Sequence, residues 1–318
     1  MKALVTGATG FIGSQLTKTL ENNGYSLRIL SRNNTTNHDT VICDLGSEEI
    51  PESALDSIDI VFHLAGYSHD LVSNPIKDKI YFDVNVKATV DLINIAAKKK
   101  VRKFIYISSV KAGGMIDKSR CMTENDQGTP DDIYGATKRQ AEIEVLRMGK
   151  THDINVSILR PALVYGVRMK GNLAIMFNGI KSGWFPPLPE TFNKRSMICI
   201  NDLIDAILLI ASDGRTNGRI YIVTDGHQYS SRDIYKAMCL ATGKDIPVWV
   251  TPKSVFSFLA WIGDNVKYIP FNSHRYKKIF GNECYSSVEL YNLGFKPKYD
   301  LFSYLKKYNK RIAEVDFR

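Results

Sequence analysis

The sequence has no long hydrophobic run and few cysteines. No stretch reaches the roughly eighteen apolar residues that a membrane-spanning helix needs, so no integral membrane segment is expected. The apolar, aromatic segment 255–262 is too short to span a bilayer and is expected to be core or a lid, with peripheral membrane contact as the alternative. Five cysteines without C-x-x-C spacing predict free thiols in a reducing compartment. Met1-Lys2 leads directly into an apolar strand pattern, so we expect no signal peptide and a cytoplasmic location.

The sequence also lacks an arginine-rich arm, a nucleic-acid motif, an internal repeat and a low-complexity tract. Its net charge is nevertheless +9. The largest basic run, 98–103, ends a predicted helix, where cations complement the helix dipole. Phosphate-bearing small molecules therefore account for the charge better than nucleic acid does, and we expect no nucleic-acid partner.

Metal-binding and hydrolase patterns are missing as well. His63 and His69 have no third ligand at a suitable spacing, so no metal is expected and His63 is predicted to lie in the core. No Ser-His-Asp order suggests a hydrolase.

Strand and helix patterns alternate through the first half of the chain. Helices are expected near 12–20, 84–99 and 134–148. The expected strands are 3–5, 27–30, 41–43, 58–64, 104–107, 156–159 and 220–223. This order predicts an α/β fold, a Rossmann-type doubly wound parallel sheet with a smaller C-terminal substrate-binding α/β part. We expect residues 1–165 with about 196–226 to bind the dinucleotide, and about 166–195 with 227–318 to bind the substrate.

A glycine-rich turn follows the first predicted strand. It reads Gly7-Ala8-Thr9-Gly10-Phe11-Ile12-Gly13, one residue longer than the G-x-G-x-x-G fingerprint of dinucleotide-binding folds. Glycines here allow a tight turn and close approach of a pyrophosphate to the free N–H groups of the next helix. We therefore predict that Gly7, Gly10, Phe11, Ile12 and Gly13 contact a nicotinamide dinucleotide.

The end of the second strand bears on the choice of cofactor. An acidic residue there would accept the ribose hydroxyls of NAD, but the sequence has Ser31-Arg32, which suits a 2′-phosphate. NADP is therefore favoured, with NAD as the alternative. Asp44-Leu45 and Leu64-Ala65-Gly66, which follow the third and fourth strands, are also expected to contact the cofactor.

The candidate catalytic residues are Ser109, Tyr134 and Lys138. Tyr134 and Lys138 are four residues apart on a predicted helix, so both side chains can reach one ligand. A nearby ammonium is expected to lower the tyrosine pKa, which would let the tyrosine exchange a proton while the nicotinamide exchanges hydride. Ser109 ends the fifth strand and is expected to hydrogen-bond the substrate oxygen. Its neighbour Ser108 is the other candidate.

Together these motifs resemble those of the extended short-chain dehydrogenase/reductases, over nearly the whole chain. The matching segments are Thr6 to Gly13, His63 to Gly66, Asn85, Ser109, Tyr134/Lys138 and Leu159-Arg160-Pro161. The resemblance implies an enzyme that binds NAD(P) and a nucleotide-sugar substrate, and members of this family often dimerise through helices near 86–97 and 134–148. It further implies that Pro161 and Ala162 pack on the nicotinamide, and that Asn172 and Arg195 contact the nucleotide phosphates.

One departure from the family pattern narrows the reaction. Sugar 4,6-dehydratases have Thr-Asp-Glu where this chain has Ser109-Val110-Lys111, so dehydration is not expected and Lys111 is predicted to contact the sugar. The pattern is most similar to UDP-4-keto-6-deoxy-hexosamine 4-reductases and UDP-sugar 4-epimerases. The sequence favours NADPH-dependent reduction of a C4 ketone, with 4-epimerisation by bound NAD as the alternative. A non-sugar ketone reductase and a non-catalytic Rossmann protein are further alternatives.

The first testable prediction concerns Arg32. A charge-assisted contact with the 2′-phosphate is expected to favour NADP by about 1.5–3 kcal/mol, or one to two decades in affinity. Arg32→Asp should therefore shift the preference toward NAD, as measured by titrating both cofactors. Equal affinity of the unmutated protein for the two cofactors would contradict this prediction.

Overall fold

A seven-stranded parallel sheet forms the centre of the protein. The computed structural model describes residues 1–318 except 36, 69–74, 118, 267–270 and 314–318. The strand order is β3-β2-β1-β4-β5-β6-β9, with every pair parallel. The strands are β1 (Lys2–Thr6), β2 (Ser26–Ser31), β3 (Asp39–Ile42), β4 (Ile60–His63), β5 (Lys103–Ile107), β6 (Asn155–Pro161) and β9 (Arg219–Val223). The predicted Rossmann-type fold is confirmed.

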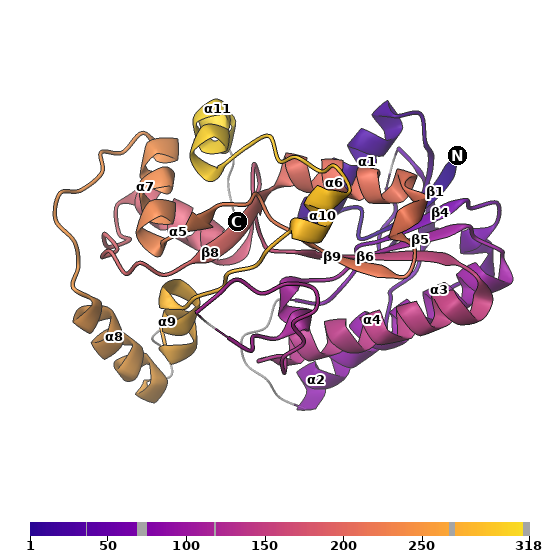
Figure 1. Ribbon diagram of the computed structural model, residues 1–318, viewed down its shortest axis with the longest axis horizontal. Coiled ribbons are helices and arrows are strands. Elements are labelled where there is room, and N and C mark those ends of the chain that lie inside the picture. Colours follow the sequence, from indigo (N-terminus) through magenta and orange to yellow (C-terminus); the bar gives the residue numbers. More distant parts are fainter. Residues whose placement is uncertain (36, 69–74, 118, 267–270, 314–318) are drawn as a thin grey trace.

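Helices cover both faces of this sheet, which explains why its central strands are continuous apolar runs (Figure 1). One face carries α1 (Phe11–Asn22), α6 (Ile200–Ser212) and α10 (Val288–Asn292). The other carries α2 (Pro75–Phe82), a π-helical segment η2 (Asp83–Lys87), α3 (Ala88–Lys98) and α4 (Ile133–His152). Short 3₁₀ turns are η1 (Glu52–Leu55), η3 (Val110–Gly113) and η4 (Gly214–Thr216).

A smaller part of the molecule is built on a second sheet. Its order is β10-β8-β7, with β7 (Leu163–Tyr165), β8 (Arg195–Cys199) and β10 (Gln228–Tyr229). Its helices are α5 (Gly171–Ser182), α7 (Ser231–Thr242), α8 (Lys253–Asn265), α9 (Ser273–Phe280) and α11 (Leu301–Ala313). A separate apolar cluster forms the core of this part. The division of the chain into two domains at the residues given above stays a prediction.

The expectation that all cysteines are free thiols is wrong for two of the five. Cys121 and Cys284 form a disulfide, with their Cα atoms 4.4 Å apart. They are 163 residues apart in sequence, so their spacing gave no sign of the pairing. The fold brings them together because Met122 pairs with Tyr285 as an isolated β-bridge. Cys43, Cys199 and Cys239 are free and buried.

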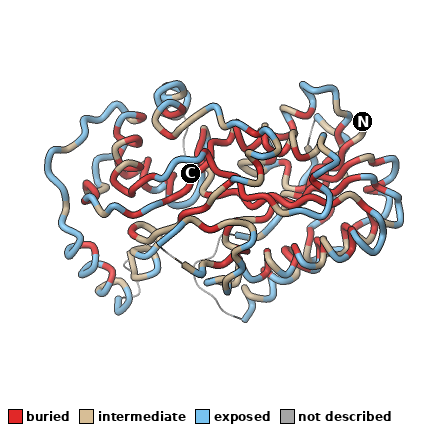
Figure 2. The backbone as a smooth tube through the Cα atoms, in the orientation of Figure 1, coloured by how far each residue is buried: buried red, intermediate tan, exposed pale blue. Residues whose placement is uncertain are grey.

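Of the two locations expected for residues 255–262, core or lid, the core is wrong for most of the segment. Within α8 only Phe256 and Ala260 are buried. Figure 2 shows most of this helix, at the far end of the molecule from the N-terminus, as exposed. Within the described residues no helix has the length and hydropathy needed to cross a bilayer.

A buried ion pair fastens α4 to the sheet. Arg160 of β6 donates from Nε and Nη2 to the two carboxylate oxygens of Glu142, at 2.9 and 2.6 Å. Both side chains are 2% exposed. Water cannot solvate either charge if the other is removed, so each depends on its partner.

Glu142→Gln should therefore lower the free energy of unfolding by about 3–5 kcal/mol, because it leaves the Arg160 guanidinium buried without a counter-charge. The matched control is Glu144→Gln on the same helix, whose ion pair with Arg147 is exposed and should contribute less than about 1 kcal/mol. Urea unfolding of both variants measures the difference. Similar destabilisation of the two variants would contradict the prediction.

Candidate active site

A long cleft runs along the carboxyl ends of the central strands. The sheet register aligns Thr6 with His63 and His63 with Tyr106, so the chain leaves three neighbouring strands at the same level. Two cavities of about 390 and 260 Å³ lie there and share Gly7, Gly10, Leu64, Gly66 and Lys170 in their walls. This is the edge at which doubly wound sheets bind dinucleotides.

Most of the predicted cofactor residues line this cleft. Those at the larger cavity are Gly7, Gly10, Ser31, Arg32, Asp44, Leu45, Leu64, Ala65 and Gly66. Those at the smaller cavity include Phe11, Ile12, Gly13, Tyr134 and Lys138. Pro161 and Ala162 line neither cavity, and Ala162 instead packs in an apolar cluster with Val110 and Ile222.

The glycine-rich turn is pressed closely against its surroundings. Gly7 has φ +70°, and a Cβ there would lie 2.7 Å from the backbone nitrogen of Ala65. A Cβ on Gly13 would lie 2.0 Å from the carbonyl oxygen of Gly7. Only glycine fits at these positions, and without side chains there the backbone N–H groups at the N-terminus of α1 stay accessible to a ligand. The turn therefore fits the pyrophosphate of a dinucleotide.

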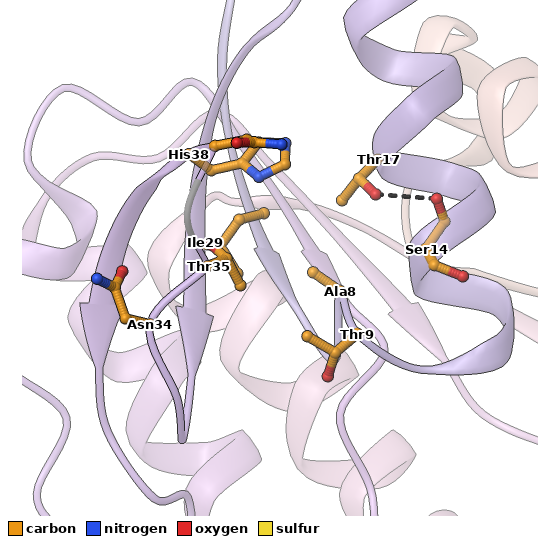
Figure 3. A pocket seen from close by; sticks show the side chains of 9 residues that line it. Ala8, Thr9, Ser14, Thr17, Ile29, Asn34, Thr35 and His38 are labelled. Atoms are coloured by element: carbon orange, nitrogen blue, oxygen red, sulfur yellow. Dashed lines mark hydrogen bonds between the residues drawn. The ribbon is translucent and has the colours of Figure 1, made fainter.

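The end of the cleft near β2 carries no acidic side chain directly after the strand. Ser31 is partly exposed and Arg32 is exposed. A further cavity of about 360 Å³ adjoins this end, and Figure 3 shows hydroxyl, amide and imidazole side chains around it. Thr9 lines both this cavity and the cleft, and His38 on its far side contacts Glu21 at 2.9 Å.

Ser109 and Tyr134 meet at the other end of the cleft. Ser109 precedes η3 and Tyr134 is the second residue of α4, which begins at the N-cap Asp132. Burial raises the pKa of Tyr134 to about 12, and a hydrogen bond with the Ser109 side chain opposes this increase. The structure thus brings together the predicted proton donor and its predicted serine partner.

Lys138 lies one turn further along α4 and is buried. Its Nζ donates to the carbonyl oxygen of Ile107 at 2.9 Å and lies 4.7 Å from the centre of the Tyr106 ring. Burial lowers the pKa of Lys138 to about 8, although the Glu142 carboxylate opposes this. The prediction that the tyrosine pKa lies below its usual value is wrong for this structure, because burial of Tyr134 outweighs the favourable contacts.

Three further residues contribute to the site: Ser108, the alternative to Ser109; Asn85, which belongs to the matching motifs; and Lys170, which the sequence did not single out. The Ser108 hydroxyl lines the smaller cavity and has no hydrogen-bond partner within the described residues. Asn85 accepts from the Tyr67 backbone at 2.7 Å and donates to Thr137 at 3.1 Å, so it ties the loop after β4 to α4. Lys170 lines both cavities. Lys170 lies two residues before Asn172, which the family resemblance singled out, and this proximity is the sequence feature that could have identified it.

The predicted substrate residues Lys111 and Arg195 are joined by an acidic residue that the sequence did not single out. Glu283 forms ion pairs with Lys111 and, at 2.9 Å, with Arg195. Although burial opposes it, these two cations hold the pKa of Glu283 below its usual value. Lys111 and Glu283 line a cavity of about 530 Å³, whereas Arg195 lies behind Glu283 and does not line it.

This cavity of about 530 Å³ adjoins the catalytic residues along the chain. Lys111 in its wall comes two residues after Ser109, and Asp132 comes two residues before Tyr134. The cavity can therefore hold the part of a substrate that extends beyond the reacting carbon. Asn172, by contrast, is exposed at the start of α5 and lines none of these cavities.

His63 is a core residue, as predicted. Its ring nitrogens lie 2.6 Å from the Thr6 hydroxyl and 2.8 Å from the Thr89 hydroxyl, and burial lowers its pKa to about 3. His69 lies outside the described residues. Among the residues that are described, no group of three potential ligands is placed to bind a metal ion.

The fold and the site define a Rossmann-type enzyme of the extended short-chain dehydrogenase/reductase class. Comparison with known proteins makes this more specific. Residues 3–224 match the NAD dependent epimerase/dehydratase family, which is more than half of the chain. The chain belongs to this family, and the predicted resemblance is confirmed.

Several similar proteins have names of enzymes that act on activated sugars, while another, 26% identical over 267 residues, is a 3-beta-hydroxysteroid dehydrogenase of Mycolicibacterium neoaurum, covering 77% of this chain and 71% of the relative. The chain is 30% identical over 266 residues to UDP-glucose 4-epimerase of Vibrio cholerae, covering 80% of this chain and 79% of the relative. It is 25% identical over 308 residues to N-acetyl-alpha-D-glucosaminyl-diphospho-ditrans,octacis-undecaprenol 4-epimerase of Escherichia coli O157:H7, covering 94% and 91%. UDP-glucuronic acid 4-epimerase of Bacillus cereus, solved with UDP-glucuronic acid and NAD, has a TM-score of 0.78 at 21% identity, covering 98% of this chain and 99% of that chain. This last likeness concerns the fold alone.

The buried ammonium of Lys138 predicts a pH-dependent stability. Its pKa is about 8 in the folded protein and ordinarily 10.5, so the unfolded chain holds more protons at this position between these pH values. Burial of the charged ammonium lowers the free energy of unfolding below pH 8. This destabilisation, about 3 kcal/mol, disappears as the pH rises toward 10.5. Lys138→Met should therefore have a higher free energy of unfolding than the unmutated protein at neutral pH. This difference should decrease as the pH rises from about 8 to 10.5.

Urea unfolding of both proteins across this pH range measures the difference. Lys150→Met, at an exposed position near the end of the same helix, is the control and should show no such trend. A stability difference for Lys138→Met that does not change with pH would rule out the proposed cost of burial.

Proposed function

We propose that this enzyme is a 4-epimerase of a UDP-linked hexose or N-acetylhexosamine, with NAD retained in the cleft. The observation that carries the proposal is the placing of Ser109, Tyr134 and Lys138 at one end of a dinucleotide-sized cleft, beside a separate cavity for the rest of the substrate. The names of the relatives support epimerisation at C4 better than they support the reduction that the sequence favoured.

When bound, NAD would accept the hydride of C4 and would return it to the opposite face of the resulting 4-keto sugar. Tyr134 takes the proton from the 4-hydroxyl group at its phenolic oxygen and gives it back after the sugar has turned. Ser109 holds the same substrate oxygen through its hydroxyl group. Lys138 holds the nicotinamide ribose and stabilises negative charge on the tyrosine. A pKa of about 12 in this structure means that Tyr134 needs the substrate and cofactor contacts to become an effective base.

The diphosphate and sugar are assigned to the cavity of about 530 Å³. Its wall carries Lys111, Lys253, Lys277 and Lys278. Lysines are suited to bind phosphate as point charges. The E. coli relative is named for a sugar on a polyprenyl diphosphate. The diphosphate is the shared chemistry, and a lipid-linked sugar is therefore a second substrate to test.

A second candidate function is NADPH-dependent reduction of a UDP-4-keto-6-deoxy-hexosamine. It is favoured by Ser31-Arg32 at the end of β2 and by the hydroxyl and amide side chains around the cavity beside Thr9, which suit an adenosine 2′-phosphate (Figure 3). Net reduction consumes the cofactor in each cycle, whereas epimerisation does not.

One experiment separates the two functions. The purified protein is incubated with UDP-glucose, UDP-GlcNAc or a polyprenyl-diphosphate GlcNAc, without added cofactor, and the products are analysed by NMR. Epimerisation should yield a mixture of C4 epimers and a protein that releases NAD on denaturation. Turnover that occurs only with UDP-4-keto-6-deoxy-GlcNAc and NADPH would replace the proposed function with the second candidate.

Two further parts of the proposal concern organisation. We keep the division into a dinucleotide-binding domain and a substrate-binding part as given from the sequence. We also keep a homodimer formed through α3 and α4, where Ile143 of α4 is an exposed apolar side chain. Analytical ultracentrifugation of the protein and of Ile143→Glu tests the dimer.

The catalytic prediction is that Tyr134→Phe lowers kcat by about 10²–10⁴, because it removes only the hydroxyl group that transfers the proton. Folding and the content of bound dinucleotide should be retained. Tyr25→Phe, in the loop between α1 and β2 away from the cleft, is the matched control and should keep full activity. A Tyr134→Phe enzyme with a near-normal rate on its true substrate would show that the catalytic assignment is wrong.

A further inference from the structure

Exposed large apolar side chains are concentrated in one segment of the smaller part, the loop before α8 and α8 itself. Within the described residues, 21 large hydrophobic side chains are exposed, and nine of them lie between positions 246 and 266. We call these nine the apolar patch: Ile246, Val248, Trp249, Val250, Val255, Phe258, Leu259, Trp261 and Val266. Scattered exposed hydrophobics are ordinary on a protein surface, but such a concentration marks an interaction site.

Helix α8 presents two apolar stripes where a surface helix normally has one. Phe256 and Ala260 are buried, and Phe256 packs edge-on against Phe280 of α9 with ring centres 5.2 Å apart. Val255, Leu259 and Ile262 share the i, i+4, i+7 spacing of a second face. Two of the three residues on that face, Val255 and Leu259, are exposed. The protein's own core therefore uses only one of the stripes.

Aromatic residues extend this second face. Phe258 and Trp261 are 59% and 62% exposed and stack with their ring centres 6.1 Å apart. Trp249, in the loop before the helix, is 64% exposed. Figures 1 and 2 place α8 and this loop at the outer edge of the molecule. Tryptophan at such a position is typical of segments that lie at the boundary between lipid headgroups and acyl chains.

The charge around the patch is positive. The described residues 241–266 and 271–280 contain five Lys or Arg residues and two Asp residues. Lys253 begins α8 and lies over the Phe280 ring at 6.0 Å. The surface thus combines exposed aromatic and aliphatic side chains with a flanking excess of lysine and arginine. Protein–protein interfaces are depleted in lysine, whereas anionic membranes attract it.

We propose that the apolar patch docks the enzyme on an anionic phospholipid bilayer, with α8 lying in the plane of the interface. Amphipathic helices that bind in this way combine buried apolar area with electrostatic attraction to acidic headgroups. Lys253 also lines the cavity of about 530 Å³ together with Lys277 and Lys278. Docking therefore places that cavity close to the headgroup layer. The proposal concerns a surface and does not depend on which reaction the catalytic site performs.

The test uses the full-length protein and vesicles of two compositions, phosphatidylcholine alone and phosphatidylcholine with about a third of phosphatidylglycerol. Co-sedimentation should show binding to the anionic vesicles that weakens as salt is added. Two of the three tryptophans lie in the patch, so tryptophan emission should shift to the blue on binding. Lipids brominated on the acyl chains should quench it.

The variant Trp249→Ser/Phe258→Ser/Trp261→Ser should lower the partition coefficient on anionic vesicles by about tenfold or more. Ile42→Ser/Val288→Ser also removes exposed apolar side chains, from β3 and α10, and should bind as the unmutated protein does. Circular dichroism and the content of bound dinucleotide establish that each variant folds. If the triple variant fails to fold, the unmutated protein still tests the proposal: quenching of its tryptophan emission by brominated lipid supports insertion of the patch, and no quenching contradicts it.

Three results would overturn the proposal. The first is no binding to anionic vesicles at low salt, and the second is binding that the triple variant and the unmutated protein share equally. The third is a dimer of the unmutated protein that the triple variant lacks, without vesicle binding, which would assign the patch to a second copy of the chain. Catalytic activity in solution can persist under any of these results, so failure here and failure of the proposed epimerase function are distinguishable.

Discussion

The buried ion pair between Glu142 and Arg160 is the interaction on which the catalytic end of the cleft depends. It attaches α4 to β6 at a point one helical turn beyond Lys138. The position of Tyr134 on the first turn of the same helix is fixed in consequence. The Glu142 carboxylate also opposes the loss of charge that burial imposes on Lys138. The pair thus both positions α4 and affects the charge of Lys138. Its two charges stay together because water reaches neither of them and each would be left unsolvated without the other.

The remaining parts of the site follow from the register of the parallel sheet. Because β1, β4 and β5 end at the same level, the glycine-rich turn, the loop after β4 and Ser108 after β5 surround one cleft. Glycine is required where the first two of these segments touch, since a side chain on Gly7 would collide with the Ala65 backbone. The segment that carries Glu283 forms part of the wall of the cavity of about 530 Å³. It is held by the Cys121–Cys284 disulfide and by its ion pairs with Lys111 and Arg195.

Local patterns succeeded where one short segment is sufficient to define a feature. The alternation of strands and helices was correct, because both faces of a parallel sheet are buried and its strands are continuous apolar runs. The glycine spacing located the cleft, and the i, i+4 spacing placed Tyr134 and Lys138 together. Local patterns failed for properties set by burial and by distant neighbours. The direction of the tyrosine pKa shift and the cysteine pairing were predicted wrongly, and the sequence left core, lid and membrane contact open for residues 255–262.

The sequence by itself determined the fold class and the family, and it located most of the residues that line the cleft, because each follows from spacing within a few residues. Only the tertiary structure decided which charges meet. Glu283 is about 90 residues from Arg195 and more than 170 from Lys111, yet it joins them. Only the tertiary structure separated the buried stripe of α8 from its exposed one, since both read as equally apolar in sequence. The physical reason is the same in each case: desolvation and long-range contacts depend on how the elements pack, and no local pattern encodes them.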